Sequence, residues 1–437
     1  MLVGCVKYHA RPLDPAASEQ QFHARSLTDP GLRAFLRRAD WPPARLGLND
    51  LIAAALYFNS DLDVARAQFR TAQAAIVTAK TRPNPAVSAG SGYETDPESH
   101  LLFNFLPSFT LVTAGKRTWR TLEAEKAADA ARVGVEETAW KVESRVRAAW
   151  LDYLISRRSL ELLRQERSVR SEIVEMLDKR VAAGDASRPE ADVERAALLS
   201  LDVAAQAAQT QMDEAGAALA SAVGLPQLPE IDTQALPSLP GSPPIGDVQK
   251  AGLLHRADIR RSLLEYAAAD AALHLEIANQ YPDFQYSPGY SFNEGFHQFS
   301  FATAFNVPLV NRNRGPIAEA EARRSEAEAR FKALQAQAIG EMQASLAAYK
   351  GALAELAEAD GRLMPNQRAR EVAMERAVQL GDQDRLALAG VRAETAVAAR
   401  ARLDAFHRAE VALGLLEDSL QHSLESGSPL PDPAAKP

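Results

Sequence analysis

The sequence predicts a mainly α-helical protein made of two structural repeats, each carrying one pair of strands. Residues 59–93 align without a gap with residues 256–290, at an offset of 197 residues, and Pro85 then meets Pro282. Long stretches carry apolar residues at helical spacing, and the stretches after these two prolines change to strand-like alternation. A period of this length is too long for a solenoid array of short repeats.

Proline-rich segments mark the borders of the two repeats. We expect an N-terminal leader at 1–45 with one short helix around 31–39, an extended linker at 226–246 and a disordered tail at 425–437. The first repeat then spans 46–225 and the second spans 247–424.

Each repeat is predicted to run through a helix, a strand pair, a very long helix and a shorter return helix. In the first repeat these are a helix at about 48–82, strands at about 85–112, a long helix at about 115–183 and a return helix at about 187–222. In the second repeat the strands lie at about 283–309, the long helix at about 315–380 and the return helix at about 383–421. Pro365 should bend the second long helix rather than end it.

The strand pairs alternate apolar and small or polar residues, most clearly at Phe299, Phe301 and Phe305. An ordinary half-buried hairpin explains such alternation, but strands of about ten residues also suit an oblique membrane crossing. Four strands cannot close a barrel, and lipid does not tolerate an open strand edge. If these strands cross a membrane, several chains must therefore contribute to one barrel.

The long helices carry coiled-coil seams. Apolar positions spaced by three and four residues are Val135, Ala139, Val142, Val146, Ala149 and Tyr153, and then Ile339, Met342, Leu346, Tyr349, Leu353 and Leu356. A helix over 115–183 would be roughly 100 Å long at 1.5 Å per residue. We expect Gly184 and Gly381 to end the long helices, and Asp185 and Asp382 to cap the return helices.

Composition excludes several function classes. A net charge of −8 without a basic block argues against a nucleic-acid partner. The eight histidines and six methionines are scattered, so we expect no metal site and no cofactor. Phosphate-loop, G-x-S-x-G and H-E-x-x-H motifs are lacking from the sequence, so we do not expect an enzyme.

The segment "LVGC" ends at Cys5, the only cysteine, and has the pattern of a bacterial lipobox. No charged or apolar segment precedes it in this sequence. We therefore expect acylation of Cys5 in a precursor that starts upstream.

In the order and spacing of these features, the sequence resembles the TolC-type outer membrane efflux proteins. The resemblance is carried by the echo of 59–85 in the second repeat, by "AGKRTWR" and "NRNRGPIAEAEA" after the strands, and by "AGDAS" and "LGDQD" at the helix ends. The leader "FHARSLTDPGLRAFL" followed later by "WPP" is similar to the cobalt-zinc-cadmium and copper-silver branch of efflux systems driven by resistance–nodulation–division (RND) pumps.

The resemblance implies a homotrimer with a 12-stranded β-barrel in the outer membrane and a long periplasmic α-helical barrel. It also implies a passive duct that works with a periplasmic adaptor and an inner-membrane RND transporter, and that contacts outer membrane lipid. Heavy-metal cations are one substrate class that the branch implies. The alternative from another class is a coiled-coil scaffold without channel activity, which would be a monomer or oligomer that needs no detergent.

The helix-hairpin ends are the first candidate site, as a surface that meets the adaptor and closes the pore. Its residues are Arg180, Gly184, Asp185, Gly381, Asp382, Gln383, Asp384 and Arg385. Family members often carry an aspartate several residues past this glycine, but here Glu190 and Asp192 follow Gly184, and Ala387 follows Gly381. Asp382 and Asp384 are the alternative acidic gate, with Arg385 able to pair with one of them.

The second candidate site is the inner rim of the membrane, where the strands give way to helices. We expect the basic residues there to meet lipid headgroups and the tryptophan to act as an interfacial aromatic. These residues are Lys116, Arg117, Trp119, Arg312 and Arg314.

Overall fold

The computed structural model describes residues 7–36, 41–43, 46–94, 100–231, 236–293, 295–424 and 433–434. The chain forms two compact units. Unit 1 comprises residues 1–62, 138–252 and 340–437, and unit 2 comprises residues 63–137 and 253–339. Helices α4, α5, α7 and α9 each continue from one unit into the other. Cys5 lies outside the described residues.

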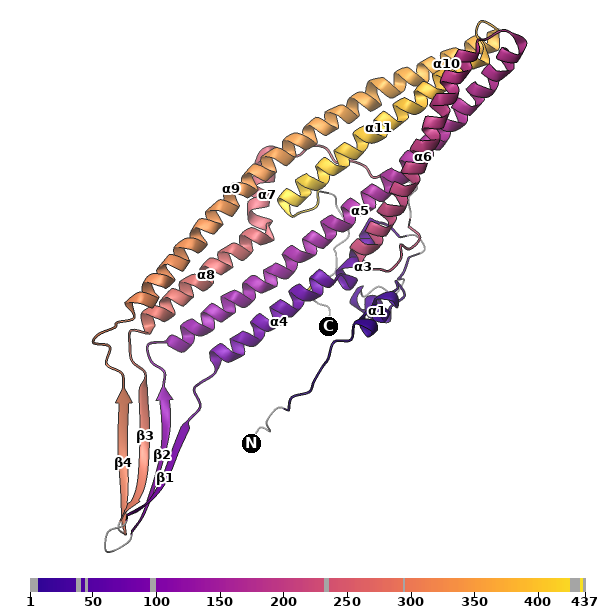
Figure 1. Ribbon diagram of the computed structural model, residues 1–437. Helices are drawn as coiled ribbons and strands as arrows, with labels where there is room; N and C mark the ends of the chain where they lie inside the picture. Colours follow the sequence, from indigo (N-terminus) through magenta and orange to yellow (C-terminus); the bar gives the residue numbers. More distant parts are fainter. Residues whose placement is uncertain are drawn as a thin grey trace. The chain divides into compact units, whose positions relative to one another are not determined.

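Unit 2 contains the only sheet of the described chain, with its strands in the order β1-β2-β3-β4 (Figure 1). The strands are β1 (Ala86–Glu94), β2 (His100–Leu111), β3 (Phe284–Asn293) and β4 (Phe296–Phe305). All neighbouring strands are antiparallel, and the register pairs Leu111 with Phe284 and Phe284 with Phe305. The two predicted strand pairs therefore form one continuous sheet with β1 and β4 at its edges.

Four helical segments extend from the sheet within unit 2, and ion pairs join them in a row. They belong to α4 (Ser60–Lys80), α5 (Lys116–Ala183), α8 (Ala257–Ala278) and α9 (Arg314–Glu358). Lys80 pairs with Glu125 across α4 and α5, Arg260 pairs with Glu136 across α8 and α5, and Arg324 pairs with Asp270 across α9 and α8.

Unit 1 contains two helix hairpins. The first joins α5 to α6 (Arg188–Val223), and the second joins α10 (Met364–Leu380) to α11 (Arg385–Leu420). A five-residue π-helix, η1 (Ala359–Leu363), links α9 to α10 directly before Pro365. A proline removes one backbone donor, and a π-turn absorbs the lost hydrogen bond within a continuing helix. Pro365 thus changes the helix locally without ending it.

The helix expected at 48–82 is in fact two helices, α3 (Leu48–Phe58) and α4. The break lies at Asn59, whose backbone is extended. Its side-chain carbonyl accepts a hydrogen bond from the Asp61 amide at 2.9 Å, while its amide donates to the Ala222 carbonyl. An asparagine that satisfies a helix start in this way favours a new N-terminus over continuation.

The leader carries more structure than expected. Besides α2 (Pro30–Leu36), a helix α1 (Pro15–His23) begins after Asp14, whose carboxylate accepts from the Ala16 amide at 3.0 Å. The linker ends at α7 (Ile245–His255). Arg25 donates to the carbonyls of Phe58 and Gly224, both at 3.0 Å, and so fastens the leader to the first repeat.

Among the described helices, none has a stretch that is both long enough and apolar enough to cross a membrane.

Candidate functional site

The two faces of the sheet differ in chemistry. The register places one set of alternate residues on a common face, and most of them are aromatic or large and apolar. The aromatic and apolar members of this aromatic face are Val87, Ala89, Tyr93, Leu101, Phe103, Phe105, Phe109, Leu111, Phe284, Tyr286, Tyr290, Phe292, Phe299, Phe301 and Phe305, and Ser91, Pro107, Pro288, His297 and Thr303 lie among them. Its rings contact one another across strands, as in Tyr286 and Phe301 at 4.4 Å between ring centroids.

The opposite face is mostly small and polar, with Phe296 at the start of β4 as its aromatic exception. It comprises Ala86, Ser88, Gly90, Gly92, Leu102, Asn104, Leu106, Ser108, Thr110, Gln285, Ser287, Gly289, Ser291, Asn293, Phe296, Gln298, Ser300, Ala302 and Ala304. No charged side chain lies on it within residues 86–93, 101–111, 284–293 and 296–305.

The aromatic face is exposed on the single chain, and its Phe299 is 81% exposed. A soluble sheet would cover such a face, whereas lipid solvates it.

The hairpin tips, residues 184–187 and 381–384, have similar backbones. Gly184 and Gly381 have φ of +84° and +82°, a left-handed conformation that favours glycine. The next amide closes each helix end, because Asp185 donates to the Arg180 carbonyl at 2.8 Å and Asp382 donates to the Ala377 carbonyl at 2.9 Å. This is a Schellman arrangement.

The predicted caps are wrong by two residues. The return helices are preceded by Ser187 and Asp384, because the backbones of Asp185 and Asp382 still belong to the Schellman turns. Asp384 accepts a hydrogen bond from the Ala387 amide at 2.8 Å.

An ion pair joins the two tips of one chain. Arg180 of α5 donates to the carboxylate of Asp384, so Arg180 and not Arg385 is the partner of this aspartate. The backbone bond from Ala387 and the Arg180 guanidinium lower the pKa of Asp384 below its ordinary value. Beneath this pair lies a small apolar core that consists of Ile173, Leu177, Ala191, Ala389 and Ala393. The tips are therefore fastened to each other as well as to their own helices.

A second cross-link between the hairpins was missed by the sequence analysis. Glu166 of α5 is only 3% exposed at its side chain and forms an ion pair with Arg400 of α11 at 3.1 Å. Arg170 approaches the other carboxylate oxygen of Glu166 at 3.6 Å. A charged residue among apolar seam positions was the only available signal, and it does not identify the partner.

The remaining tip residues lie at the surface. Gln383 and Arg385 are exposed, as are Glu190 and Asp192 on the first turns of α6. Asp192 pairs with Arg195 at 2.7 Å. The structure thus brings Arg180 and Asp384 together, while Asp185 and Asp382 remain exposed on separate turns.

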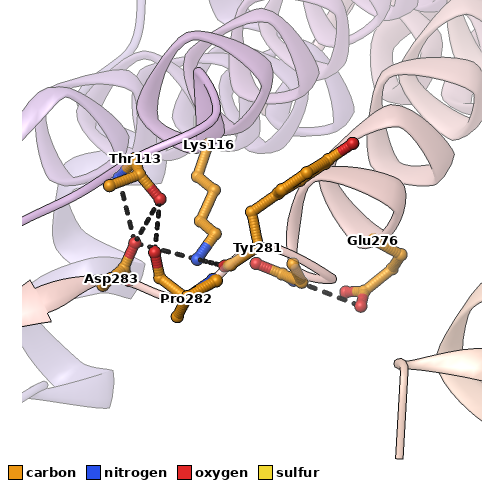
Figure 2. Close-up of polar contacts among 7 residues, drawn as sticks. Thr113, Lys116, Glu276, Tyr281, Pro282 and Asp283 are labelled. Atoms are coloured by element: carbon orange, nitrogen blue, oxygen red, sulfur yellow. Dashed lines mark hydrogen bonds and ion pairs between the residues drawn. The ribbon is translucent and has the colours of Figure 1, made fainter. Parts of the chain in front are cut away.

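The prediction that Lys116 meets lipid headgroups is wrong. Lys116 is buried, and its Nζ donates to the Tyr281 carbonyl at 2.7 Å and to Asp283 at 2.8 Å (Figure 2). Thr113 adds bonds from its amide to Asp283 at 3.0 Å and from its hydroxyl to the Pro282 carbonyl at 2.6 Å. Lys116 therefore joins the end of β2 to the start of β3 instead of facing outward.

The other predicted rim residues lie at the expected end of the sheet. Arg117, Arg312 and Arg314 are exposed, and Trp119 stacks on His274 with 4.3 Å between ring centroids. Arg82 and Arg120 are exposed at the same end, and the sequence analysis did not single them out. The five rim arginines are Arg82, Arg117, Arg120, Arg312 and Arg314. They form no ion pair with any residue that the structure describes.

Metal-binding chemistry is not apparent in the described part of the chain, which has no cluster of three or more histidine, cysteine, aspartate or glutamate side chains placed to hold an ion.

This architecture is similar to that of known outer membrane proteins. The family model described as "Outer membrane efflux protein" matches residues 51–225. No curated protein sequence matches the chain.

Solved structures share the fold over most of the chain at low sequence identity. The CmeC outer membrane channel of Campylobacter jejuni is 15% identical, with 99% of this chain and 97% of that chain covered and a TM-score of 0.71. The outer membrane protein VceC of Vibrio cholerae is 21% identical, with 86% and 97% covered and a TM-score of 0.69. CusC, which forms a transmembrane channel, is 16% identical, with 97% and 99% covered and a TM-score of 0.69.

Proposed function

We propose that this chain is an outer membrane efflux protein and forms the passive exit duct of a tripartite efflux system. The family match over residues 51–225 and the shared fold support the predicted family and the predicted place in the outer membrane. The single observation that carries the duct is the two-faced sheet, with one aromatic face and one polar face that carries no charged side chain within residues 86–93, 101–111, 284–293 and 296–305.

The free edges of the sheet support a barrel shared by several copies, and the resemblance to the TolC-type proteins supports a homotrimer with 12 strands. Strands β1 and β4 each have a free edge in the described chain, and lipid does not tolerate unpaired backbone groups. Three copies would pair β1 of one with β4 of the next, with the aromatic face toward lipid. The polar face would then line a lumen that does not select strongly by charge.

The trimer is tested by size in detergent. Purified protein should be a trimer by light scattering and should form stepwise conductances in planar bilayers. A stable monomer in buffer without detergent would instead support the scaffold alternative.

The tips are proposed to meet a periplasmic adaptor, through which an inner-membrane RND pump loads the duct. Exposed Asp185, Asp382, Gln383 and Arg385 support this, because they surround glycines that present the backbone at the surface. Deletion of 380–385 should leave trimers intact and abolish export. Unchanged export would remove the tips from the docking surface.

The rim arginines are proposed to bind phosphate headgroups of the membrane's inner leaflet. Their support is their position at the end of the aromatic face and their lack of ion pairs among described residues, whereas Arg260, Arg261 and Arg324, farther along the helices of unit 2, are all paired. In nanodiscs, a change from phosphatidylcholine to phosphatidylglycerol should raise the apparent Tm of the protein. The double variant Arg117→Gln, Arg312→Gln should lose this increase, and the equally charged variant Arg323→Gln, Arg330→Gln should keep it.

Two further proposals concern the anchor and the cargo. The lipobox pattern supports acylation of Cys5, and Cys5→Ser in a full-length precursor should abolish labelling with a palmitate analogue. The leader's resemblance to the cobalt-zinc-cadmium and copper-silver branch supports heavy-metal cations as substrates. A deletion strain should then be sensitive to these metals, and sensitivity to drugs alone would contradict it.

A further inference from the structure

Three large apolar side chains lie on the polar face of the sheet, which otherwise carries small or polar residues. Leu102 and Phe296 lie next to the strand hairpins, and Leu106 lies near the middle of β2. The helices of unit 2 join the opposite end of the sheet (Figure 1). In the proposed duct, the hairpin end of the sheet is therefore the outer mouth.

Leu102 and Leu106 lie close against the sheet because each has a glycine beside it. The Cβ of an alanine at Gly92 would lie 3.5 Å from the Leu102 side chain, and that of an alanine at Gly289 would lie 3.5 Å from the Leu106 side chain. A glycine leaves this space to its neighbour because it has no Cβ. Both leucines are accordingly only partly exposed on the single chain.

Phe296 has no glycine opposite it. Its partner in the register is Asn293, and β4 is an edge strand of the chain. Phe296 is 74% exposed, although it is the largest residue of the polar face. Its ring therefore extends away from the sheet, on the side that would line the lumen.

The width of the proposed lumen decides which side chains a solute meets. Twelve strands about 4.8 Å apart and tilted by about 40° close into a backbone ring about 24 Å across. A small solute passes through such a lumen without touching most of its wall, so it contacts the protein where long side chains extend inward. Three copies would place three Phe296 rings around the outer mouth, and we call this set of rings the aromatic collar.

We propose that the aromatic collar binds organic cations that carry apolar groups, and that Phe296 thereby determines the specificity of the duct. This inference rests on the proposed trimeric duct and adds a class of cargo to it. The face of an aromatic ring attracts a cation, and apolar groups are buried against the ring. Residues 86–93, 101–111, 284–293 and 296–305 contain no Asp, Glu, Lys or Arg, so no such charge within these strands attracts or repels a cation more strongly than the rings do. A hydrated metal cation has no apolar group to bury and should pass the collar without binding.

Single-channel currents in planar bilayers test the collar, with tetrabutylammonium as the apolar cation and tetramethylammonium as the small one. Tetrabutylammonium should reduce the wild-type current at concentrations at which tetramethylammonium has no effect. Phe296→Ser should raise the tetrabutylammonium concentration for half block by about tenfold, because the cation–ring contacts are lost. The conductance without blocker should rise in this variant, since three rings leave the mouth. Phe296→Leu keeps an apolar side chain without the ring and should give an intermediate half-block concentration.

The matched control is Phe299→Ser, the same substitution on the aromatic face of the same strand. Phe299 is 81% exposed but would face lipid, so this variant should keep the wild-type block. Phe296→Leu decides the question if Phe296→Ser forms no trimers by light scattering.

The outcomes separate the collar from the duct. A block that is unchanged in both Phe296 variants, or lost equally in Phe299→Ser, would overturn the collar while normal conductance leaves the duct standing. Wild-type trimers without any conductance would instead refute the proposed duct, and the collar with it.

Discussion

The ammonium group of Lys116 lies 2.8 Å from the carboxylate of Asp283 and joins the first strand pair to the second. The Lys116 side chain is 7% exposed and that of Asp283 is 35% exposed. Burial raises the pKa of Asp283, but the bonds from Lys116 and Thr113 outweigh burial and hold it below its ordinary value. The two residues lie 167 positions apart, so the pair fixes the register of the central strands β2 and β3.

Removing Asp283 should destabilise the protein more than removing Lys116. Asp283→Ala leaves a buried ammonium group with only the Tyr281 carbonyl, and we expect a loss of about 3 kcal/mol of stability. Lys116→Met leaves a carboxylate that water and Thr113 still solvate, and we expect a loss of about 1–2 kcal/mol. Urea unfolding in detergent should show the double variant to be more stable than Asp283→Ala. If the stability loss of the double variant equals the sum of the two single losses, the two groups do not interact.

The same pair gives a pH dependence. Because the folded pKa of Asp283 lies below its ordinary value of 3.8, the contribution of its carboxylate to stability is fully present above about pH 3.8 and is lost as the pH falls through the folded pKa. The stability difference between wild type and Asp283→Asn should therefore be constant from pH 5 to 7 and shrink below pH 3.8. A difference that grows toward low pH would contradict the lowered pKa.

Periodicity predicted the strands, the long helices and the left-handed glycines, because these features repeat at an offset of 197 residues. The break at Asn59 could not be predicted in this way, because an apolar pattern continues through it and the deciding partner, the Ala222 carbonyl, lies 163 residues away. Lys116 was misplaced for the same reason. A basic residue next to a strand indicates a membrane rim, and only the fold brings Asp283 within reach.

The N-caps of the two return helices were predicted two residues too early for a different reason. Glycine followed by aspartate indicates both a helix end and a cap, but the Schellman turn occupies the residue after the glycine. The cap then moves on by two residues, to Ser187 and Asp384. Contacts across the hairpins, such as that of Glu166 with Arg400, depend on helix rotation and could not be read from either repeat alone.

Gly184 and Gly381 should be more sensitive to alanine than glycines elsewhere in the helices. Both have open space at the position of an added Cβ, so an alanine meets no steric clash with neighbouring residues. The stability lost is then only that of placing an alanine in the left-handed conformation, about 1 kcal/mol at each site. Gly381→Asn should cost less, because asparagine tolerates this conformation. Gly340→Ala is the control. It lies within α9 with open space around it, and we expect a gain of about 0.5–1 kcal/mol. Equal effects at 340 and 381 in thermal unfolding would contradict the role of the turn.

Glu143 should be replaceable by glutamine with a gain in stability. Burial raises the pKa of Glu143, the Arg147 charge lowers it and the Asp418 charge raises it further, so the Glu143 carboxylate is less stable in the folded chain than in water. In the unfolded chain at pH 7 this carboxylate is ionised without that cost. Glu143→Gln should therefore raise the apparent Tm. The gain should disappear as the pH falls to about 4.5, where the unfolded group also takes up its proton. Glu175→Gln is the control, because the bond from Lys179 lowers the pKa of Glu175 and its substitution should bring no gain.

Neighbouring residues of β4 give the sharpest test of the two sheet faces. Phe301 belongs to the aromatic face and contacts Tyr286, whereas Ser300 belongs to the polar face and lies opposite Gly289. An arginine on the lipid side of a membrane strand costs about 2–4 kcal/mol at mid-depth, while lumen positions tolerate charge. Phe301→Arg should therefore strongly reduce trimer yield and urea resistance in lipid vesicles. Ser300→Arg should retain both, since the glycine opposite leaves room, and should shift the channel toward anions. If the two variants were equally destabilised, both faces would be packed against protein, and the aromatic face could not be the one that lipid covers.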